Sequence, residues 1–272
     1  MIPGVVENRV TIEVVDGVAD VRMNRADKRN ALDNAMFTSL AAAGEYLKTQ
    51  SEIRAVVLSG DGASFCAGLD FGSFQQMAGS SGDGKRQPQA SDITDGAITH
   101  LGQQACWVWQ ELPVPVIAAV HGHALGGGIQ IALGADIRIA HPDTQFSVRE
   151  TYWGLIPDMT GSLMLSQLVR ADVAKELIFT ARIFDGREAK ELGVVTSLSD
   201  NPYDDAMALA QEMTLRSPSA LRNAKALVNG LIHERAASQF AAERRLIGEL
   251  IGSAHQVEAV MAHFEKRAPN FI

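Results

Sequence analysis

The fold is decided by residues 116–136, which read Val116-Ile-Ala-Ala-Val-His-Gly-His-Ala-Leu-Gly-Gly-Gly-Ile-Gln-Ile-Ala-Leu-Gly-Ala-Asp136. The apolar run predicts a buried strand, and a turn of glycines leads from it into an amphipathic helix. Three consecutive glycines, Gly126 to Gly128, leave backbone N–H groups unobstructed at the start of that helix, where the helix dipole favours negative charge. Such a turn suits a phosphate or an oxyanion. The alternative is that the glycines only allow close helix packing.

Known phosphate-binding motifs do not fit this turn. A phosphate loop needs Lys-Ser/Thr after its last glycine, and a dinucleotide loop needs a fixed glycine spacing that residues 122–128 lack. A second turn of small residues, Ser64-Phe-Cys-Ala-Gly-Leu-Asp70, follows the short β-branched run 53–59. N–H groups from the two turns together predict an oxyanion hole. No Gly-x-Ser-x-Gly nucleophile accompanies them and Cys66 has no adjacent base, so an acid or base is expected to do the chemistry.

The rest of the chain predicts an α/β core followed by a helical unit. Residues 10–24 alternate around an Asp-Gly turn and predict a hairpin, and apolar spacing predicts a helix over 35–48 with Asp33 as its cap. Strands that alternate with helices predict an α/β fold. We place the domain boundary at residue 201, with a core over 1–200 and helices over 201–272. The expected C-terminal helices cover residues 204–217, 219–233 and 236–267.

Composition excludes several classes of protein. The chain has 272 residues and a net charge of −8, so nucleic acid or an anionic membrane is not its expected main partner. Two cysteines, Cys66 and Cys106, have neither zinc-motif spacing nor the density of a secreted scaffold. The N-terminus resembles neither a signal nor a transit peptide, and no apolar run reaches about 18 residues. We expect a cytoplasmic protein.

Several motifs in order along the chain resemble the crotonase family, the enoyl-CoA hydratases and isomerases. They are the two glycine turns, Asn24-Arg-Ala-Asp-Lys-Arg-Asn-Ala-Leu32, Phe179-Thr-Ala-Arg182, Ala189-Lys-Glu-Leu-Gly-Val-Val195 and Phe264-Glu-Lys-Arg-Ala-Pro-Asn-Phe271. The resemblance implies a spiral of ββα units, a C-terminal helical trimerisation region, and trimers or hexameric pairs of trimers. It also implies a coenzyme A thioester as substrate and no further cofactor. In the family, the N–H groups that match Leu69 and Gly127 hold the thioester oxygen.

The catalytic carboxylates distinguish reactions within the family. Hydratases carry Glu at the position of Gln130, and their second carboxylate matches Glu150. Asp158 stands where hydratases usually have glycine and where dienoyl-CoA isomerases have Asp, although those isomerases also carry an acid at position 130. An amide cannot exchange a proton near neutral pH. The resemblance therefore favours isomerisation of 3,5-dienoyl-CoA to 2,4-dienoyl-CoA in fatty acid metabolism, with Glu150 and Asp158 as the acid–base pair and Gln130 as the third position of the site.

Residues around the two turns and at the chain end are expected to bind the substrate. Lys28 and Arg29 lie in the family's coenzyme-binding turn, and Phe264 with Lys266 match C-terminal residues that reach the nucleotide in relatives. The remaining expected substrate-binding residues are Ala31, Cys66, Ala67, Gly68, Asp70 and Gly126. Residues 72–96, rich in Gly, Ser, Gln and Asp, occupy the place where relatives line the acyl pocket, and Lys85-Arg86 offer weaker cations there.

Other interpretations stay open at this point. The protein is alternatively a hydratase in which Glu150 works alone with a water held by Gln130, or a non-catalytic acyl-CoA- or RNA-binding trimer. Asp158 is alternatively a helix N-cap, and Glu150 alternatively forms a surface ion pair with Arg149. His121 and His123 lack a third ligand at metal spacing, so no metal site is expected. Residues 107, 109, 159 and 164 are expected in the core, and the cations open to RNA are Arg216, Arg222, Lys225, Arg244 and Arg245.

Overall fold

The computed structural model describes residues 4–5, 8–70, 72 and 97–271. The chain starts with the expected hairpin of β1 (Val10–Val15) and β2 (Val18–Met23), which pair antiparallel. Asp16 and Gly17 between them have φ of 51° and 79°. Two consecutive positive φ values are what a two-residue hairpin turn requires, and Asp-Gly is a favoured pair for it.

A six-stranded sheet forms the centre of the molecule, in the order β1-β2-β3-β4-β6-β8. From β2 onward, all neighbouring strands pair in parallel. The added strands are β3 (Ala55–Gly60), β4 (Val116–Val120), β6 (Ile137–Ala140) and β8 (Ser197–Leu198). Every residue of β3 and β4 is buried, as expected for parallel strands covered on both faces.

A second, smaller sheet consists of β5 (His123–Leu125) and β7 (Gln145–Ser147). Single backbone bridges extend it on both sides, joining Leu32 with Leu69, Cys66 with Ala124, and Phe146 with Phe184. Successive turns of the chain thus add a strand to the large sheet and a short pairing to the small one. This is the expected spiral of ββα units, and it brings residues 66–69 next to residues 124–126.

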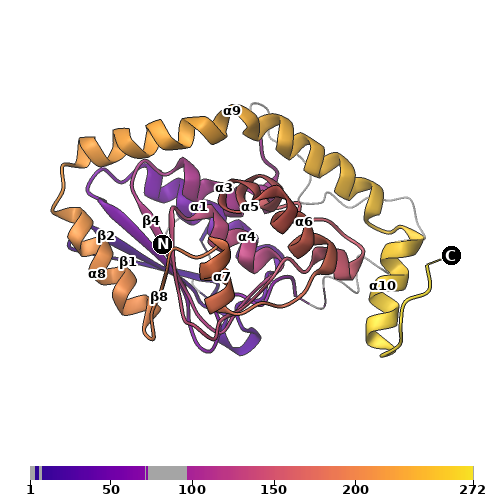
Figure 1. Cartoon of the computed structure of the whole chain (residues 1–272). Helices are drawn as coiled ribbons and strands as arrows, with labels where there is room; N and C mark the ends of the chain where they lie inside the picture. The colour runs from indigo at the N-terminus through magenta and orange to yellow at the C-terminus, as the bar shows by residue number, and fades with distance from the viewer. Residues whose placement is uncertain (1–3, 6–7, 71, 73–96, 272) are drawn as a thin grey trace.

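Helices cover both faces of the large sheet (Figure 1). Alternate strand residues face α8 on one side, and the others face the main core on the other side. Trp107 and Trp109 are buried in the main core, as expected, and so are Met159 and Met164. The helical elements before the last two helices are η1 (Ala26–Lys28), α1 (Asn34–Lys48), α3 (Leu101–Glu111), α4 (Gly127–Gly134), η2 (Glu150–Trp153), α5 (Gly161–Leu168), α6 (Ala171–Thr180), α7 (Gly186–Leu192) and α8 (Pro202–Thr214).

Two helical predictions need correction. The helix after the glycine turn, α4, is not amphipathic, because all of its residues are buried at the centre of the molecule. The predicted helices over 219–233 and 236–267 are instead one helix of 33 residues, α9 (Pro218–Leu250), followed by α10 (Ala254–Phe264). Glu234-Arg235 contains no helix breaker, whereas Gly252 takes a φ of +74° and Ser253 caps α10. The chain therefore turns seventeen residues later than expected.

Helix α9 crosses the whole molecule, and α10 lies at its far end (Figure 1). The Lys225 ammonium fastens α9 to the core through an ion pair of 2.7 Å with Asp136. The domain boundary at residue 201 and the trimerisation role of the last helices stay predictions. No helix within the described ranges is long and apolar enough to cross a membrane. The predicted loop 72–96, with Lys85-Arg86, lies outside the described residues apart from Gly72.

Candidate active site

The two glycine turns lie directly against each other. Gly68 has a φ of +90°, and a Cβ added there would come within 2.6 Å of the Leu125 carbonyl oxygen. A Cβ on Gly128 would come within 2.2 Å of the Cys66 carbonyl oxygen. Backbone cannot give way as a flexible side chain does, so both positions require glycine. The prediction that these glycines serve close packing and the prediction that they expose N–H groups are therefore both compatible with the geometry.

The predicted oxyanion hole consists of the N–H groups of Leu69 and Gly127. The flanking amides are used, because Asp70 N donates to Leu32 O and Gly126 N donates to Ser147 O. Within the described part of the chain, neither Leu69 N nor Gly127 N has a hydrogen-bond acceptor. Gly127 is also the first residue of α4, where the helix dipole favours negative charge. Two unused donors, one from each turn, are what an anionic oxygen needs.

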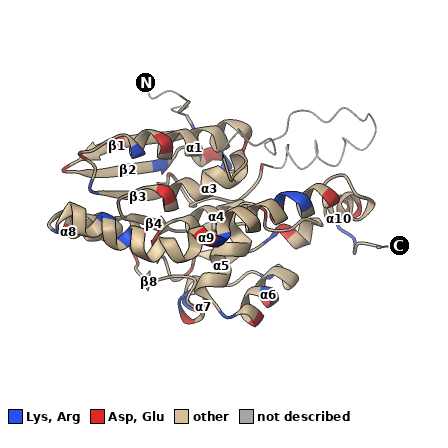
Figure 2. Ribbon diagram, turned by 90° about the horizontal axis from the view of Figure 1, so that it is seen from above, with Lys and Arg blue, Asp and Glu red and all other residues tan. Residues whose placement is uncertain are grey.

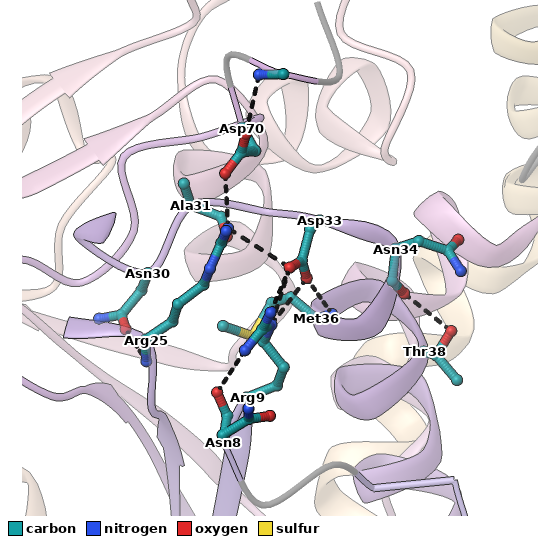
Figure 3. A network of polar contacts seen from close by, with 11 residues as sticks. Asn8, Arg9, Arg25, Asn30, Ala31, Asp33, Asn34, Met36, Thr38 and Asp70 are labelled. Atoms are coloured by element: carbon teal, nitrogen blue, oxygen red, sulfur yellow. Dashed lines mark hydrogen bonds and ion pairs between the residues drawn. The ribbon is translucent and has the colours of Figure 1, made fainter. Parts of the chain in front are cut away.

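An ionic network holds the first turn in place (Figure 3). The guanidinium of Arg25 lies between Asp33 and Asp70, and its Nη1 is 2.8 Å from Asp70 Oδ2. The same Nη1 donates to the carbonyl oxygen of Ala31 at 2.9 Å. Hydrogen bonds from the Gly72 N–H and from Arg25 lower the pKa of Asp70. Asp70 and Ala31 therefore hold the Leu69 backbone in position through their own contacts within the protein.

Cys66 is a packing residue with an inert thiol. Its side chain is fully buried and its Sγ donates to the Asn30 carbonyl oxygen at 3.2 Å. Burial raises the pKa of this thiol to about 12. The thiolate is the reactive form of cysteine, so covalent catalysis by Cys66 is excluded near neutral pH.

Glu150 begins η2 and lies beside the second turn. Only 8% of the residue is exposed, and a Cβ added to Gly126 would come within 3.4 Å of Glu150 Oε1. Oε1 accepts a hydrogen bond of 2.6 Å from Gln130 Nε2, while the buried Oε2 has no partner within the described residues. The interpretation of Glu150 as the partner of Arg149 in a surface ion pair is wrong, because the Arg149 guanidinium lies 4.0 Å above the centre of the Tyr152 ring.

Gln130 is held so that only its amide nitrogen can face Glu150. Its Oε1 accepts from Met159 N and from Gly161 N, both at 2.9 Å. These two backbone donors fix which end of the amide is oxygen. Both acceptor sites of the carbonyl are filled, so it has no lone pair left to orient a water.

Asp158 lies just before α5 and is partly buried. The N-cap of α5 is Thr160, two residues later, so the interpretation of Asp158 as the cap is wrong. Burial, together with the nearby charges of Glu150 and Glu243, raises the pKa of Asp158 to about 8. Burial likewise raises the pKa of Glu150 to about 7, against the hydrogen bond from Gln130. Two carboxyls that titrate near neutral pH are able to exchange protons with a substrate.

The residues expected at the coenzyme lie on the surface. Lys28 and Arg29 are exposed at the end of η1, and Ala67 N donates to Arg29 O, which ties this turn to the first glycine turn. Phe264 and Lys266 are exposed at the end of α10, which packs on η2.

The sequence did not predict the contacts of α10 with the site. Trp153 packs with Val260 of α10 and with Leu69, and the rings of Trp153 and His263 are 4.6 Å apart. The sequence also did not predict that Glu243 of α9 lies near the site. A lone tryptophan or a helical glutamate carries no local signal of these roles.

The structure offers little to the non-catalytic RNA-binding alternative. Acidic and basic residues occur side by side along α9 (Figure 2). Each of the five proposed cations, Arg216, Arg222, Lys225, Arg244 and Arg245, donates to another group of the same chain. Among the described residues, no cluster of three His, Cys, Asp or Glu side chains is arranged to hold a metal ion.

Comparisons with known proteins agree with this fold. The sequence profile of the enoyl-CoA hydratase/isomerase family matches residues 13–272. The mouse enoyl-CoA hydratase domain-containing protein 2, a mitochondrial protein, is 34% identical over 94% of this chain and 84% of its own. The short-chain-enoyl-CoA hydratase of Clostridium acetobutylicum is 32% identical over 96% of each chain. The solved structure of an enoyl-CoA hydratase/isomerase from Pseudoalteromonas atlantica T6c superposes with a TM-score of 0.84 at 28% identity, covering 97% of this chain and 100% of that one.

The spiral fold with its paired glycine turns is the crotonase fold. The chain belongs to the enoyl-CoA hydratase/isomerase family.

Proposed function

We propose that this protein is an acyl-CoA double-bond isomerase that converts 3,5-dienoyl-CoA into 2,4-dienoyl-CoA. The observation that carries the proposal is the set of side chains at the three family positions. Glu150 and Asp158 are carboxyls with pKa values near neutrality, and position 130 holds an amide. Two proton-exchanging groups are what a shift of a conjugated diene needs, because one proton leaves and another returns at a different carbon.

In this proposal Glu150 is the base and Asp158 is the acid. Burial raises the pKa of both carboxyls, and the charge of Glu150 raises the pKa of Asp158 as well, so an ionised Glu150 keeps Asp158 protonated. Glu150 takes the proton from C2 of the thioester, and the electron pair of the C–H bond moves toward the carbonyl oxygen to form an enolate conjugated with both double bonds, so that C6 becomes nucleophilic. The N–H groups of Leu69 and Gly127 hold the enolate oxygen. Asp158 then protonates C6, which leaves double bonds at C2 and C4.

The substrate and assembly follow from the same proposal. A coenzyme A thioester brings phosphates, which Lys28 and Arg29 on the exposed η1 turn and Lys266 after α10 bind. Helix α9 exposes Leu227, Val228 and Leu231 by 78%, 62% and 76%. Apolar exposure of this size on one helix supports a trimer, or a pair of trimers, formed through the C-terminal helices. A cytoplasmic location stays a prediction.

The second candidate is an enoyl-CoA hydratase. The names of the relatives favour it, since the Clostridium acetobutylicum protein is a short-chain-enoyl-CoA hydratase. In this candidate Glu150 alone activates a water, and Gln130 helps to hold it. The proposal that Gln130 holds the water is disfavoured, because both acceptor sites of its Oε1 are filled and only amide N–H remains available to the water.

An ultraviolet assay separates the two candidates. Purified protein is given 3,5-dienoyl-CoA, and formation of the conjugated 2,4-diene is followed, while loss of the enoyl absorbance is followed separately with 2-enoyl-CoA. Fast diene formation with little hydration supports the isomerase. Hydration without diene formation refutes it in favour of the second candidate, and silence in both assays refutes both.

A further inference from the structure

Glu243 is a buried carboxylate that the proposed chemistry does not use. It lies in α9 and is 2% exposed. Oε2 accepts from Thr160 N at 3.1 Å and from Gln103 Nε2 at 2.9 Å. Oε1 accepts from Ser162 N at 3.3 Å and from Ser162 Oγ at 2.5 Å. Burial raises the pKa of Glu243, and the donors that surround both oxygens act against burial and stabilise the ionised form.

These contacts hold the turn that leads from Asp158 into α5. Thr160, the N-cap, has a φ of +71° and makes no side-chain cap of its own. Its neighbouring amides are bound instead by two side chains from other helices. Gln130 of α4 accepts hydrogen bonds from the N–H groups of residues 159 and 161, and Glu243 of α9 accepts them from the N–H groups of residues 160 and 162. Four successive amides are thus fixed alternately from two sides.

We propose that Glu243 is a positioning residue for Asp158, and that α9 thereby holds the acid of the active site in place. The inference rests on the proposed function, in which Asp158 delivers the second proton. Asp158 directly precedes the four clamped amides, so its backbone cannot move without breaking hydrogen bonds to Gln130 or Glu243. A displacement of about 1 Å at a reacting group is enough to cost on the order of a hundredfold in rate.

The charge of Glu243 also supports the role of Asp158 as the acid. It raises the pKa of Asp158 and of Glu150, which keeps the acid protonated at neutral pH. The other titratable groups around Glu243 are the Cys106 thiol and the His100 ring of α3, and Arg244 on α9 itself. Arg244 makes no ion pair with Glu243, since its guanidinium bonds to Gln103 Oε1 and to the Ile98 carbonyl oxygen.

The test compares Glu243→Gln with the wild type in full pH profiles of kcat and KM on 3,5-dienoyl-CoA. We expect kcat to fall at least about tenfold with KM unchanged within about twofold, because the acid is misplaced while the coenzyme contacts stay. Both limbs of the kcat profile should move to lower pH, because a like charge has been removed. Glu249→Gln, an exposed change on the same helix, is the control and should behave as wild type.

Four outcomes overturn the proposal or separate it from the proposed function. An unchanged kcat and pH profile in folded Glu243→Gln refutes the positioning role, and so does a loss of thermal stability alone. If Glu243→Gln does not fold, Ser162→Ala decides, because it removes one donor to Glu243 and keeps the charge. The kcat of Ser162→Ala should fall about threefold while both limbs of its pH profile stay where they are in the wild type. An unchanged kcat refutes the proposal. A wild-type protein that only hydrates refutes the isomerase, and the same variants are then compared in hydration.

Discussion

Replacing Glu150 by glutamine removes the proposed base and leaves the shape of the site intact. The amide oxygen can still accept the hydrogen bond from Gln130 Nε2 that Glu150 Oε1 accepts at 2.6 Å. Positioned general bases contribute about 10² to 10⁴ in rate. We therefore expect kcat on 3,5-dienoyl-CoA to fall by at least about a hundredfold, while coenzyme A binds with unchanged affinity.

The same change should stabilise the fold at high pH. Burial raises the pKa of Glu150 from 4.5 to about 7, and each unit is worth about 1.36 kcal/mol, so ionising Glu150 in the folded state costs roughly 3 kcal/mol. Because the folded pKa is raised, the contribution of Glu150 to stability is complete below pH 4.5 and is lost as the pH rises through about 7. Glu150→Gln should therefore be more stable than wild type by up to about 3 kcal/mol at pH 9, with no such gain at pH 4.5.

The assays are diene formation, calorimetric titration with coenzyme A, and urea unfolding at pH 4.5, 7 and 9. Taking the difference between variant and wild type at each pH cancels the titration of groups that do not interact with Glu150, whereas Asp158, whose pKa the charge of Glu150 raises, contributes to the measured difference. The matched control is Glu249→Gln, whose carboxylate is 62% exposed, and its stability should change by less than about 0.5 kcal/mol at every pH. Turnover retained in Glu150→Gln contradicts the role of the base. A stability difference that does not vary with pH contradicts the burial argument.

Three further changes probe the neighbours of Glu150. Gln130→Glu places a second carboxyl oxygen where Nε2 now lies 2.6 Å from Glu150 Oε1, so the two carboxyls should share one proton and the pH–rate profile of isomerisation should gain a second titration at higher pH; an unchanged profile would contradict the coupling, and a sharp gain in hydration would favour the hydratase instead. Asp158→Asn should lower diene formation by about 10² or more and raise the urea midpoint at pH 9, because burial has raised the pKa of this acid to about 8; equal turnover would remove Asp158 from the mechanism. Gly128→Ala brings a Cβ within 2.2 Å of the Cys66 carbonyl oxygen. The free energy of unfolding in urea should fall by about 1–3 kcal/mol, and kcat/KM should fall as well; a variant with wild-type stability would show that the two glycine turns can separate freely.

Local signals in the sequence were sufficient for most of the fold. Asp33 was predicted as a helix cap, and its side chain accepts from Met36 N at the start of α1. The short strands β5 and β7 carry no such signal, since three residues are too few to show an alternating pattern. The end of α9 was misplaced because helix ends are decided by breakers, and Gly252-Ser253 supplies a breaker and a cap whereas Glu234-Arg235 contains neither.

The catalytic positions were predicted through the family motifs, but their electrostatics were not. Glu150 and Asp158 match acids of relatives, and the structure adds the burial that raises both pKa values. Glu243 was not predicted, because a glutamate in a long polar helix is typical of a solvated face. Its role depends on contacts with residues 160 and 162, about eighty positions away, which no local pattern reveals.

The amide at position 130 changes the chemistry of the site and preserves its structure. Any residue there must offer an oxygen to the N–H groups of Met159 and Gly161, and both glutamine and glutamate do so. They differ in the group that faces Glu150, where glutamate presents a second acid and glutamine presents a donor. The donor occupies Glu150 Oε1 and leaves the buried Oε2 as the oxygen of Glu150 that has no partner among the described residues. In the proposed mechanism, one free base oxygen on Glu150 and a separate acid at Asp158 are suited to moving a proton between two carbons.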